Sequence, residues 1–207
     1  MRQVLCFGDS NTYGYVPGTA ERYDWDTRWT GIVGTGLMEK GYIVQEEGLC
    51  GRTTVFDDPL RPGRRGSELL PIILETHKPE DLIILMLGTN DCKTFYGATA
   101  GSIGLGIRKL VRQIRDGAPS AKILLMSPIA RRSGMDLIRN LETILYRCPK
   151  SCRRFTGRSQ RKKDFIIWRL LIMPYHRNGI RSTWMKKGIR HWQKRYWKRF
   201  QRYCNVS

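Results

Sequence analysis

Residues 4–14 read VLCFGDSNTYG, and this stretch decides the fold that we expect. A short apolar run ends at Gly8, and Asp9 and Ser10 follow where a buried strand would pass into a helix. A side chain at that point faces the crevice in which open α/β sheets carry out their chemistry. Ser10 could serve there as a nucleophile with Asp9 as a supporting residue, or it could simply cap the helix.

Strands and helices alternate along the first part of the chain. Apolar runs predict strands at residues 4–7, 42–46, 81–87 and 122–126, and helical spacing predicts helices at residues 29–40, 67–76 and 103–114. This alternation predicts a parallel sheet that helices cover on both faces. Gly101, Gly104 and Gly106 follow no strand, so we predict a loop there and not a nucleotide-binding turn.

Polar, glycine-bearing turns follow two more of these strands. GLCGRTT, residues 48–54, comes after the second strand, and GTND, residues 88–91, comes after the third. In a doubly wound sheet these strand ends converge on Ser10. The N–H groups of Ser10 and Gly51 and the amide of Asn90 could surround an oxyanion. Alone, each glycine indicates a turn and Asn90 a local cap, but three such turns together favour a site.

The three blocks FGDSNTYG, GLCGRTT and GTND resemble, in order, those of the SGNH hydrolases, also called GDSL esterases and lipases. RWTG at residues 28–31 and EEG at residues 46–48 are similar to the arylesterase and acyltransferase branch. The resemblance covers residues 1–129 and implies a flavodoxin-like three-layer α/β/α sandwich with a parallel sheet.

The same resemblance implies a serine esterase that needs no metal or organic cofactor. Ser10 would be the nucleophile, and Ser10, Gly51 and Asn90 would be the oxyanion donors. The implied partner is a small-molecule ester of a small or aryl group, or an acyl group on a carbohydrate. The sequence leaves open whether the chain hydrolyses the ester or transfers the acyl group, and whether it forms a homo-oligomer.

The family also needs an Asp-x-x-His block whose histidine takes the proton of the serine, and this chain has none. The residues three positions before His77, His176 and His191 are leucine, methionine and glycine. A serine without a base is a weak nucleophile, so we expect an impaired enzyme. The general base is unknown, because nothing in the sequence positions His176 or His191 as a substitute.

The net charge of +19 comes entirely from the second part of the chain. Residues 1–130 hold 15 Lys and Arg against 15 Asp and Glu, whereas residues 131–207 hold 22 against 3. We therefore divide the chain into a truncated SGNH-hydrolase-like α/β domain at residues 1–129 and a strongly basic tail at residues 130–207.

A shifted reading frame would explain the basic tail. Trp184 and Met185 have one codon each, and the frame that starts at the last base of the Trp184 codon reads Asp at their junction. In the same shifted frame, the codon that spans residues 179 and 180 can encode Asp, and the codon that spans residues 182 and 183 can encode His. These two positions stand three apart, as the missing block requires. We interpret residues from about 130 onward as out of frame.

Taken at face value, the tail is a basic segment that carries many aromatic residues. Such a segment could bind nucleic acid or an anionic membrane without any catalysis. Its charge would also attract polyanions non-specifically. This alternative predicts salt-sensitive retention of RNA without ester turnover, whereas the enzyme interpretation predicts turnover that Ser10→Ala abolishes.

Composition argues against several other classes of protein. No run reaches the ~18 apolar residues of a membrane span, and the first residues do not form a signal peptide, so we expect a cytoplasmic protein. The six cysteines show no disulfide framework. Cys148 and Cys152 lack a second pair of ligands at metal-binding spacing, so we expect no metal site.

Overall fold

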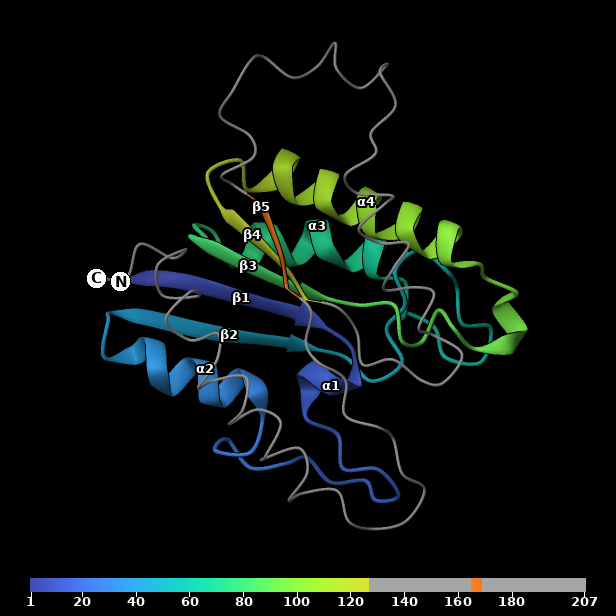
Figure 1. The fold of residues 1–207 in the computed structure, drawn as a ribbon, viewed down its shortest axis with the longest axis horizontal. Coiled ribbons are helices and arrows are strands. Elements are labelled where there is room, and N and C mark those ends of the chain that lie inside the picture. The colour runs from blue at the N-terminus through green and yellow to red at the C-terminus, as the bar shows by residue number, and fades with distance from the viewer. Residues whose placement is uncertain (127–164, 169–207) are drawn as a thin grey trace.

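The computed structural model describes residues 1–126 and 165–168, and within these residues five strands form one sheet (Figure 1). The strand order is β2-β1-β3-β4-β5, and all neighbouring strands are parallel. This order has its switch point between β1 and β3. The strands are β1 (Arg2–Gly8), β2 (Tyr42–Gly48), β3 (Leu82–Met86), β4 (Lys122–Met126) and β5 (Phe165–Trp168).

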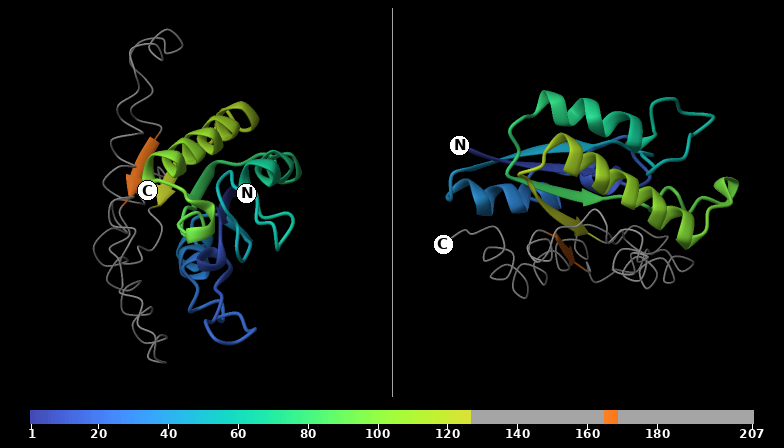
Figure 2. Two further views of the ribbon diagram at one scale, coloured as in Figure 1. Left: turned by 90° about the vertical axis from the view of Figure 1, so that its right-hand side faces the viewer. Right: turned by 90° about the horizontal axis from the view of Figure 1, so that it is seen from above.

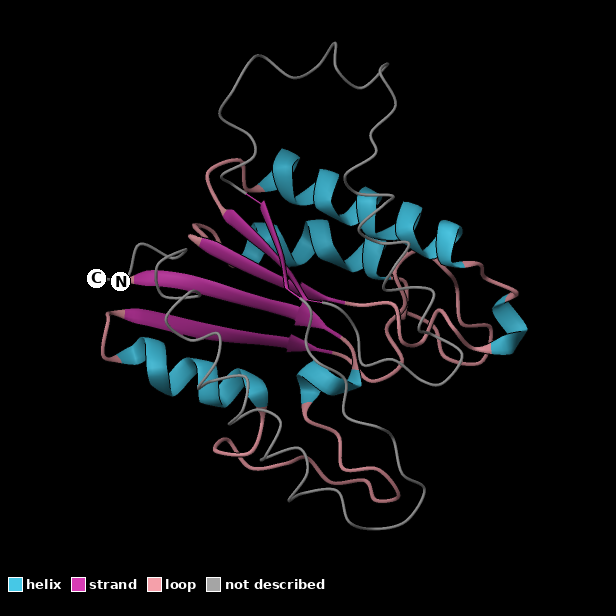
Figure 3. Cartoon of the chain, in the orientation of Figure 1, coloured by secondary structure: helices cyan, strands magenta, loops and turns pink. Residues whose placement is uncertain are grey.

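Helices cover both faces of this sheet, as the secondary-structure colouring of Figure 3 shows. In Figure 2, α3 and α4 lie on one side of the sheet and α2 lies on the other. The α/β prediction, with a flavodoxin-like three-layer arrangement, is confirmed. The helices are α1 (Ser10–Tyr13), α2 (Trp29–Met38), α3 (Gly66–Thr76), the 3-10 helix η1 (Thr94–Tyr96) and α4 (Ala100–Gly117).

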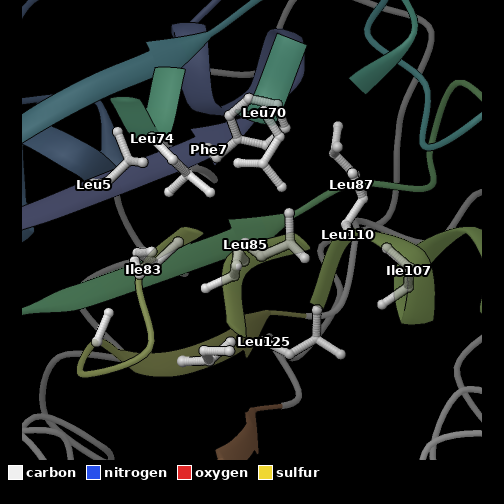
Figure 4. Packing of buried hydrophobic residues seen from close by; sticks show 14 of the residues in the cluster. Leu5, Phe7, Leu70, Leu74, Ile83, Leu85, Leu87, Ile107, Leu110 and Leu125 are labelled. Carbon is white, nitrogen blue, oxygen red and sulfur yellow. The ribbon is translucent and has the colours of Figure 1, made fainter. Parts of the chain in front are cut away.

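The alternation of side chains along the strands builds two apolar cores. Leu5 and Phe7 of β1 pack with Leu70 of α3 and Leu110 of α4 (Figure 4). The alternate residues of β1 face the other way, against α2. Cys6, for example, is buried with tryptophan, valine and leucine side chains of that helix. Every residue of β3 is buried, as the continuous apolar run predicts for a central parallel strand.

The helix predicted at residues 103–114 is confirmed and begins earlier, at Ala100, so the loop interpretation of Gly101, Gly104 and Gly106 was wrong. A capping box starts the helix: Thr99 Oγ1 accepts from the Ser102 N–H at 3.1 Å, and Ser102 Oγ accepts from the Thr99 N–H at 3.0 Å. A Cβ atom on Gly106 would lie 2.2 Å from Oγ1 of Thr54. The glycine therefore permits close helix packing.

The second part of the chain supplies a strand of the same sheet, and the division into domains at residue 129 stays a prediction. Strand β5 pairs in parallel with β4, with Phe165 opposite Ile123 and Trp168 opposite Met126. The second part of the chain thus contributes an edge strand to the sheet. Our other predictions for the tail, including those for His176 and His191, concern positions outside the described residues and stay predictions.

In the part of the chain that the structure describes, no helix is both long and apolar enough to cross a bilayer. Within the same residues, His, Cys, Asp and Glu nowhere form a group of three or more that could hold a metal ion. Among the described cysteines, Cys6 and Cys50 are free thiols. The cytoplasmic location, the lack of a cofactor and the oligomeric state stay predictions.

Candidate active site

Three loops leave the carboxyl edge of the sheet at the same level. Gly8, the last residue of β1, lies opposite Gly48 of β2 and Met86 of β3. The loops that carry Ser10, Gly51 and Asn90 therefore start side by side, and Figure 1 shows α1 at the ends of β1 and β2. We call residues 9–15 the first loop, residues 49–54 the second loop and residues 87–91 the third loop.

Hydrogen bonds join the three loops to one another. The carbonyl oxygen of Gly8 accepts from the backbone N–H of Leu49 at 3.1 Å and from Nη1 of Arg52 at 3.0 Å. The amide Nδ2 of Asn90 donates to the carbonyl oxygen of Arg52 at 3.0 Å. A continuous chain of hydrogen bonds thus runs from the end of β1 through the second loop to the third.

Ser10 is the first residue of α1, and Asp9 is the residue that caps this helix. Oδ1 of Asp9 accepts from the backbone N–H and from Nδ2 of Asn11, both at 2.9 Å. The structure therefore assigns the capping role, which the sequence left open for Ser10, to its neighbour. The partly buried hydroxyl of Ser10 is not used by the cap.

Asp9 is a buried carboxyl group directly beside Ser10. It is 1% exposed, and its Oδ2 atom has no hydrogen-bond partner among the described residues. Burial raises the pKa of Asp9 to about 6, although hydrogen bonds from Asn11 oppose this shift; the charge of Asp91 adds to it. The carboxyl that supports α1 therefore changes its charge close to neutral pH.

Gly51 adopts a backbone conformation that favours glycine, with φ at 89°. Two contacts anchor the backbone around it: the Thr53 N–H donates to the carbonyl oxygen of Arg64 at 2.9 Å, and Nε of Arg64 donates to that of Cys50 at 2.9 Å. Arg64, in the segment that leads into α3, thus holds the second loop on both sides of Gly51. This fixes the peptide groups on either side of Gly51.

Asn90 bonds to another loop, so it is not the local cap that we considered as an alternative. An amide nitrogen carries two hydrogens, and the bond to Arg52 leaves one for a ligand. The adjacent Asp91 is fully buried, and its Oδ1 accepts from the Thr54 N–H at 2.9 Å and also from the Thr54 hydroxyl. Burial raises the pKa of Asp91. The third loop is thereby tied to the second at two points.

Two residues with a structural part in this region were missed in our reading of the sequence. The sequence analysis gave Arg52 no role beyond its place in the GLCGRTT block, yet it forms hydrogen bonds with Gly8 and Asn90. Glu46 accepts from Arg22 at 2.8 Å and from Arg28 at 3.0 Å, and it also bonds to Thr30. A charged side chain that is largely buried on a strand needs partners, and that rule was the available signal for Glu46.

His77 is the histidine that the described part of the chain contains. It follows the last residue of α3, and its Nε2 is 2.9 Å from Oε1 of Glu47. The helix begins at Gly66, whose N–H donates to the carbonyl oxygen of Thr53 at 3.0 Å. At the other end of the helix, the contact with Glu47 brings the His77 ring to the end of β2, where the carbonyl oxygen of Glu47 also accepts from Arg52.

The sequence model of the GDSL-like lipase/acylhydrolase family matches residues 6–160. A carbohydrate acetylesterase from Sinorhizobium meliloti, Est24, has a similar solved structure, with 34% identity and a TM-score of 0.65 over 81% of this chain and 84% of that one. The inhibitor-bound aryl esterase of M. smegmatis shares 28% identity with a TM-score of 0.71, over 94% of this chain and 98% of that one. A search of curated proteins found no match.

The fold and these similarities together define a carboxylic ester hydrolase with an SGNH hydrolase fold. The chain belongs to the GDSL-like lipase/acylhydrolase family. The family resemblance that the three sequence blocks predicted is thereby confirmed, and the match to the family extends past residue 129.

Proposed function

We propose that this protein cleaves carboxylic esters of small or aryl groups through an acyl-enzyme on Ser10. The Ser10 oxygen attacks the ester carbonyl carbon, and the N–H groups of Ser10 and Gly51 and the amide of Asn90 hold the oxyanion. Collapse of this intermediate breaks the bond to the alcohol, which leaves with the proton of the serine. Water or a second alcohol then takes the acyl group, by hydrolysis or by acyl transfer.

The observation that carries this proposal is the chain of hydrogen bonds from Gly8 through Arg52 to Asn90. It joins the end of β1, directly before Asp9 and Ser10, to the second and third loops, whose residues would act on one carbonyl group. Such preorganised donors are usually the largest single contribution to catalysis of this type. The similarity to an aryl esterase and to a carbohydrate acetylesterase supports small acyl groups as the substrates.

As written, the chain lacks the Asp-x-x-His block, so we expect the slow turnover that an oxyanion hole and binding alone supply. We infer that the tail is out of frame. Two structures of the M. smegmatis aryl esterase support this inference. The native form is 34% identical over 81% of this chain, and the inhibitor-bound form is 28% identical over 94%. The longer alignment therefore adds residues of this chain without adding identical ones, as expected for a tail that is out of frame. The family match to residue 160 and strand β5 favour a break later than residue 130.

The experiment is the hydrolysis of 4-nitrophenyl acetate by the full chain, by Ser10→Ala and by Ser120→Ala. Ser120 is an exposed serine in the turn before β4 and is a matched control. We expect Ser10→Ala to lose the turnover and Ser120→Ala to keep it. Equal rates for Ser10→Ala and the unmodified chain would refute the proposal, and salt-sensitive RNA retention without turnover would favour the binding alternative.

A further inference from the structure

We propose that Arg52 is a positioning residue that fixes the three loops of the candidate site relative to one another. The inference rests on the proposed function, because it concerns the residues that would hold the oxyanion. Arg52 would act through Gly8 and Asn90, without touching the substrate. Its side chain holds the ends of two strands, and its carbonyl group holds the amide of a third loop.

The side chain of Arg52 is buried at the carboxyl edge of the sheet, with the residue 3% exposed. Its Nη1 donates to the carbonyl oxygen of Gly8 at 3.0 Å and also to that of Glu47. The guanidinium carbon lies 4.1 Å from the centre of the Phe7 ring. Gly8 ends β1 and Glu47 is the penultimate residue of β2, so one side chain holds the strand ends that lead to Ser10 and Gly51.

The main chain of Arg52 makes the third connection. Its carbonyl oxygen accepts from Nδ2 of Asn90 at 3.0 Å. This bond orients the amide plane of Asn90 and therefore the direction of its second N–H group. Arg52, itself in the second loop, thus contacts the strand end that leads into the first loop and the amide of the third loop, and a displacement of this residue would move these parts relative to one another.

Packing alone would not favour an arginine at this position. Burial lowers the pKa of Arg52 to about 10, although the charges of Glu47 and Asp9 oppose this shift. The acceptors of Nη1 are neutral carbonyl oxygens, and Nε has no hydrogen-bond partner among the described residues. An apolar side chain of similar volume is often as stabilising as a buried charge, so the planar fork of donors is the property that an arginine adds here.

The decisive variant is Arg52→Lys, which keeps the charge and loses the flat fork. We expect kcat for 4-nitrophenyl acetate to fall about 10²-fold, as when one oxyanion donor is lost. KM should change little, because the displaced groups act mainly in the transition state. A kcat at the wild-type level would overturn the proposal, since the positive charge alone would then suffice.

Arg28→Lys is the matched control for a merely structural effect. Arg28 also donates to a backbone carbonyl, that of Tyr23 at 2.6 Å, and its guanidinium carbon lies 5.4 Å from the centre of the Trp25 ring. The residues that Arg28 contacts in the described part of the chain lie between positions 14 and 46. Of these, only Gly14 belongs to one of the three loops. We expect both variants to lower the melting temperature and Arg52→Lys alone to lower kcat. Equal losses of kcat in the two variants would contradict a positioning role.

A measurement on the unmodified chain separates this inference from the proposed function. The side-chain amide signals of Asn90 are assigned by nuclear magnetic resonance from their loss in Asn90→Ala. We expect one of the two amide protons to exchange slowly with solvent, because it is bonded to Arg52. If both exchange as fast as those of a free asparagine, the proposal fails, whether or not Arg52→Lys folds. Absence of Ser10-dependent turnover with slow exchange would instead refute the proposed function alone.

Discussion

Nη1 of Arg61 lies 3.0 Å from the position that a Cβ atom on Gly51 would occupy. Gly63, in the segment that leads into α3, offers a comparison: its φ is 72° against 89° for Gly51, and a Cβ atom there would meet no atom within 4 Å. The two glycines share a left-handed backbone and differ in their surroundings. They therefore form a matched pair for testing the part that Gly51 plays.

Gly51→Ala and Gly63→Ala should each lower the free energy of unfolding by about 1–2 kcal/mol, because an L-residue is strained in this conformation. Only Gly51→Ala should also lower kcat, since its methyl group displaces Arg61 and the peptide group of a proposed oxyanion donor. Urea denaturation and an ester assay measure the two effects. If both variants kept full activity, Gly51 would not belong to the site.

Gly106→Ala and Gly101→Ala should change stability in opposite directions. A methyl group on Gly106 would meet Oγ1 of Thr54 at 2.2 Å, and overpacking of this kind costs typically 1–3 kcal/mol, or about 2 kcal/mol here. Gly101 is exposed in the same helix, and a Cβ atom there would lie 3.6 Å from Oγ1 of Thr99, an ordinary contact. Gly101→Ala should therefore raise the free energy of unfolding by about 0.5–1 kcal/mol. Thermal unfolding measures both. A neutral Gly106→Ala would show that α4 does not pack this closely against the second loop.

Asp9→Asn should change how stability depends on pH. The pKa of Asp9 is raised from 3.8 to about 6 in the folded protein, so folding favours the protonated form. This contribution to the free energy of unfolding is fully present below pH 3.8 and is lost as the pH rises through about 6. Asn keeps the capping oxygen and has no proton to lose.

Between about pH 4 and pH 7.5 the unmodified chain should therefore lose about 2 kcal/mol more than Asp9→Asn. Urea denaturation at the two pH values gives this difference, and the contribution from Glu80, whose pKa is also raised, cancels between the proteins. Parallel pH profiles for the two proteins would mean that Asp9 titrates normally.

The coding DNA should contain one inserted or deleted base near the start of the tail. Sequencing of codons 120 to 150, extended through codon 165 because of the match to residue 160, tests this. If repair of the frame restores an Asp-x-x-His block, turnover should rise by about 10⁴-fold or more, as expected when a catalytic base is regained. An intact frame would contradict the out-of-frame interpretation and make the basic tail the feature to assay.

The layers of the fold could be predicted because apolar runs such as residues 81–87 have few alternatives. The three polar turns could likewise be placed at one edge, since parallel strands end together. Our interpretation of Gly106 failed because a glycine signals both loops and close packing, and only the position of Thr54 distinguishes the two. The bonds of Arg52 join residues far apart in the chain, and no local pattern indicates which carbonyl groups a buried arginine will reach.

The most direct test of the central claim is to look for the acyl-enzyme itself. Because the missing base slows the deacylation of Ser10 as well as its acylation, we expect the acyl group to accumulate on Ser10 during prolonged incubation with 4-nitrophenyl acetate. Intact-protein mass spectrometry with peptide mapping should find one acetyl group on Ser10, and none at that site in Ser10→Ala. Turnover without any label on Ser10, or the same overall labelling in Ser10→Ala, would contradict the mechanism.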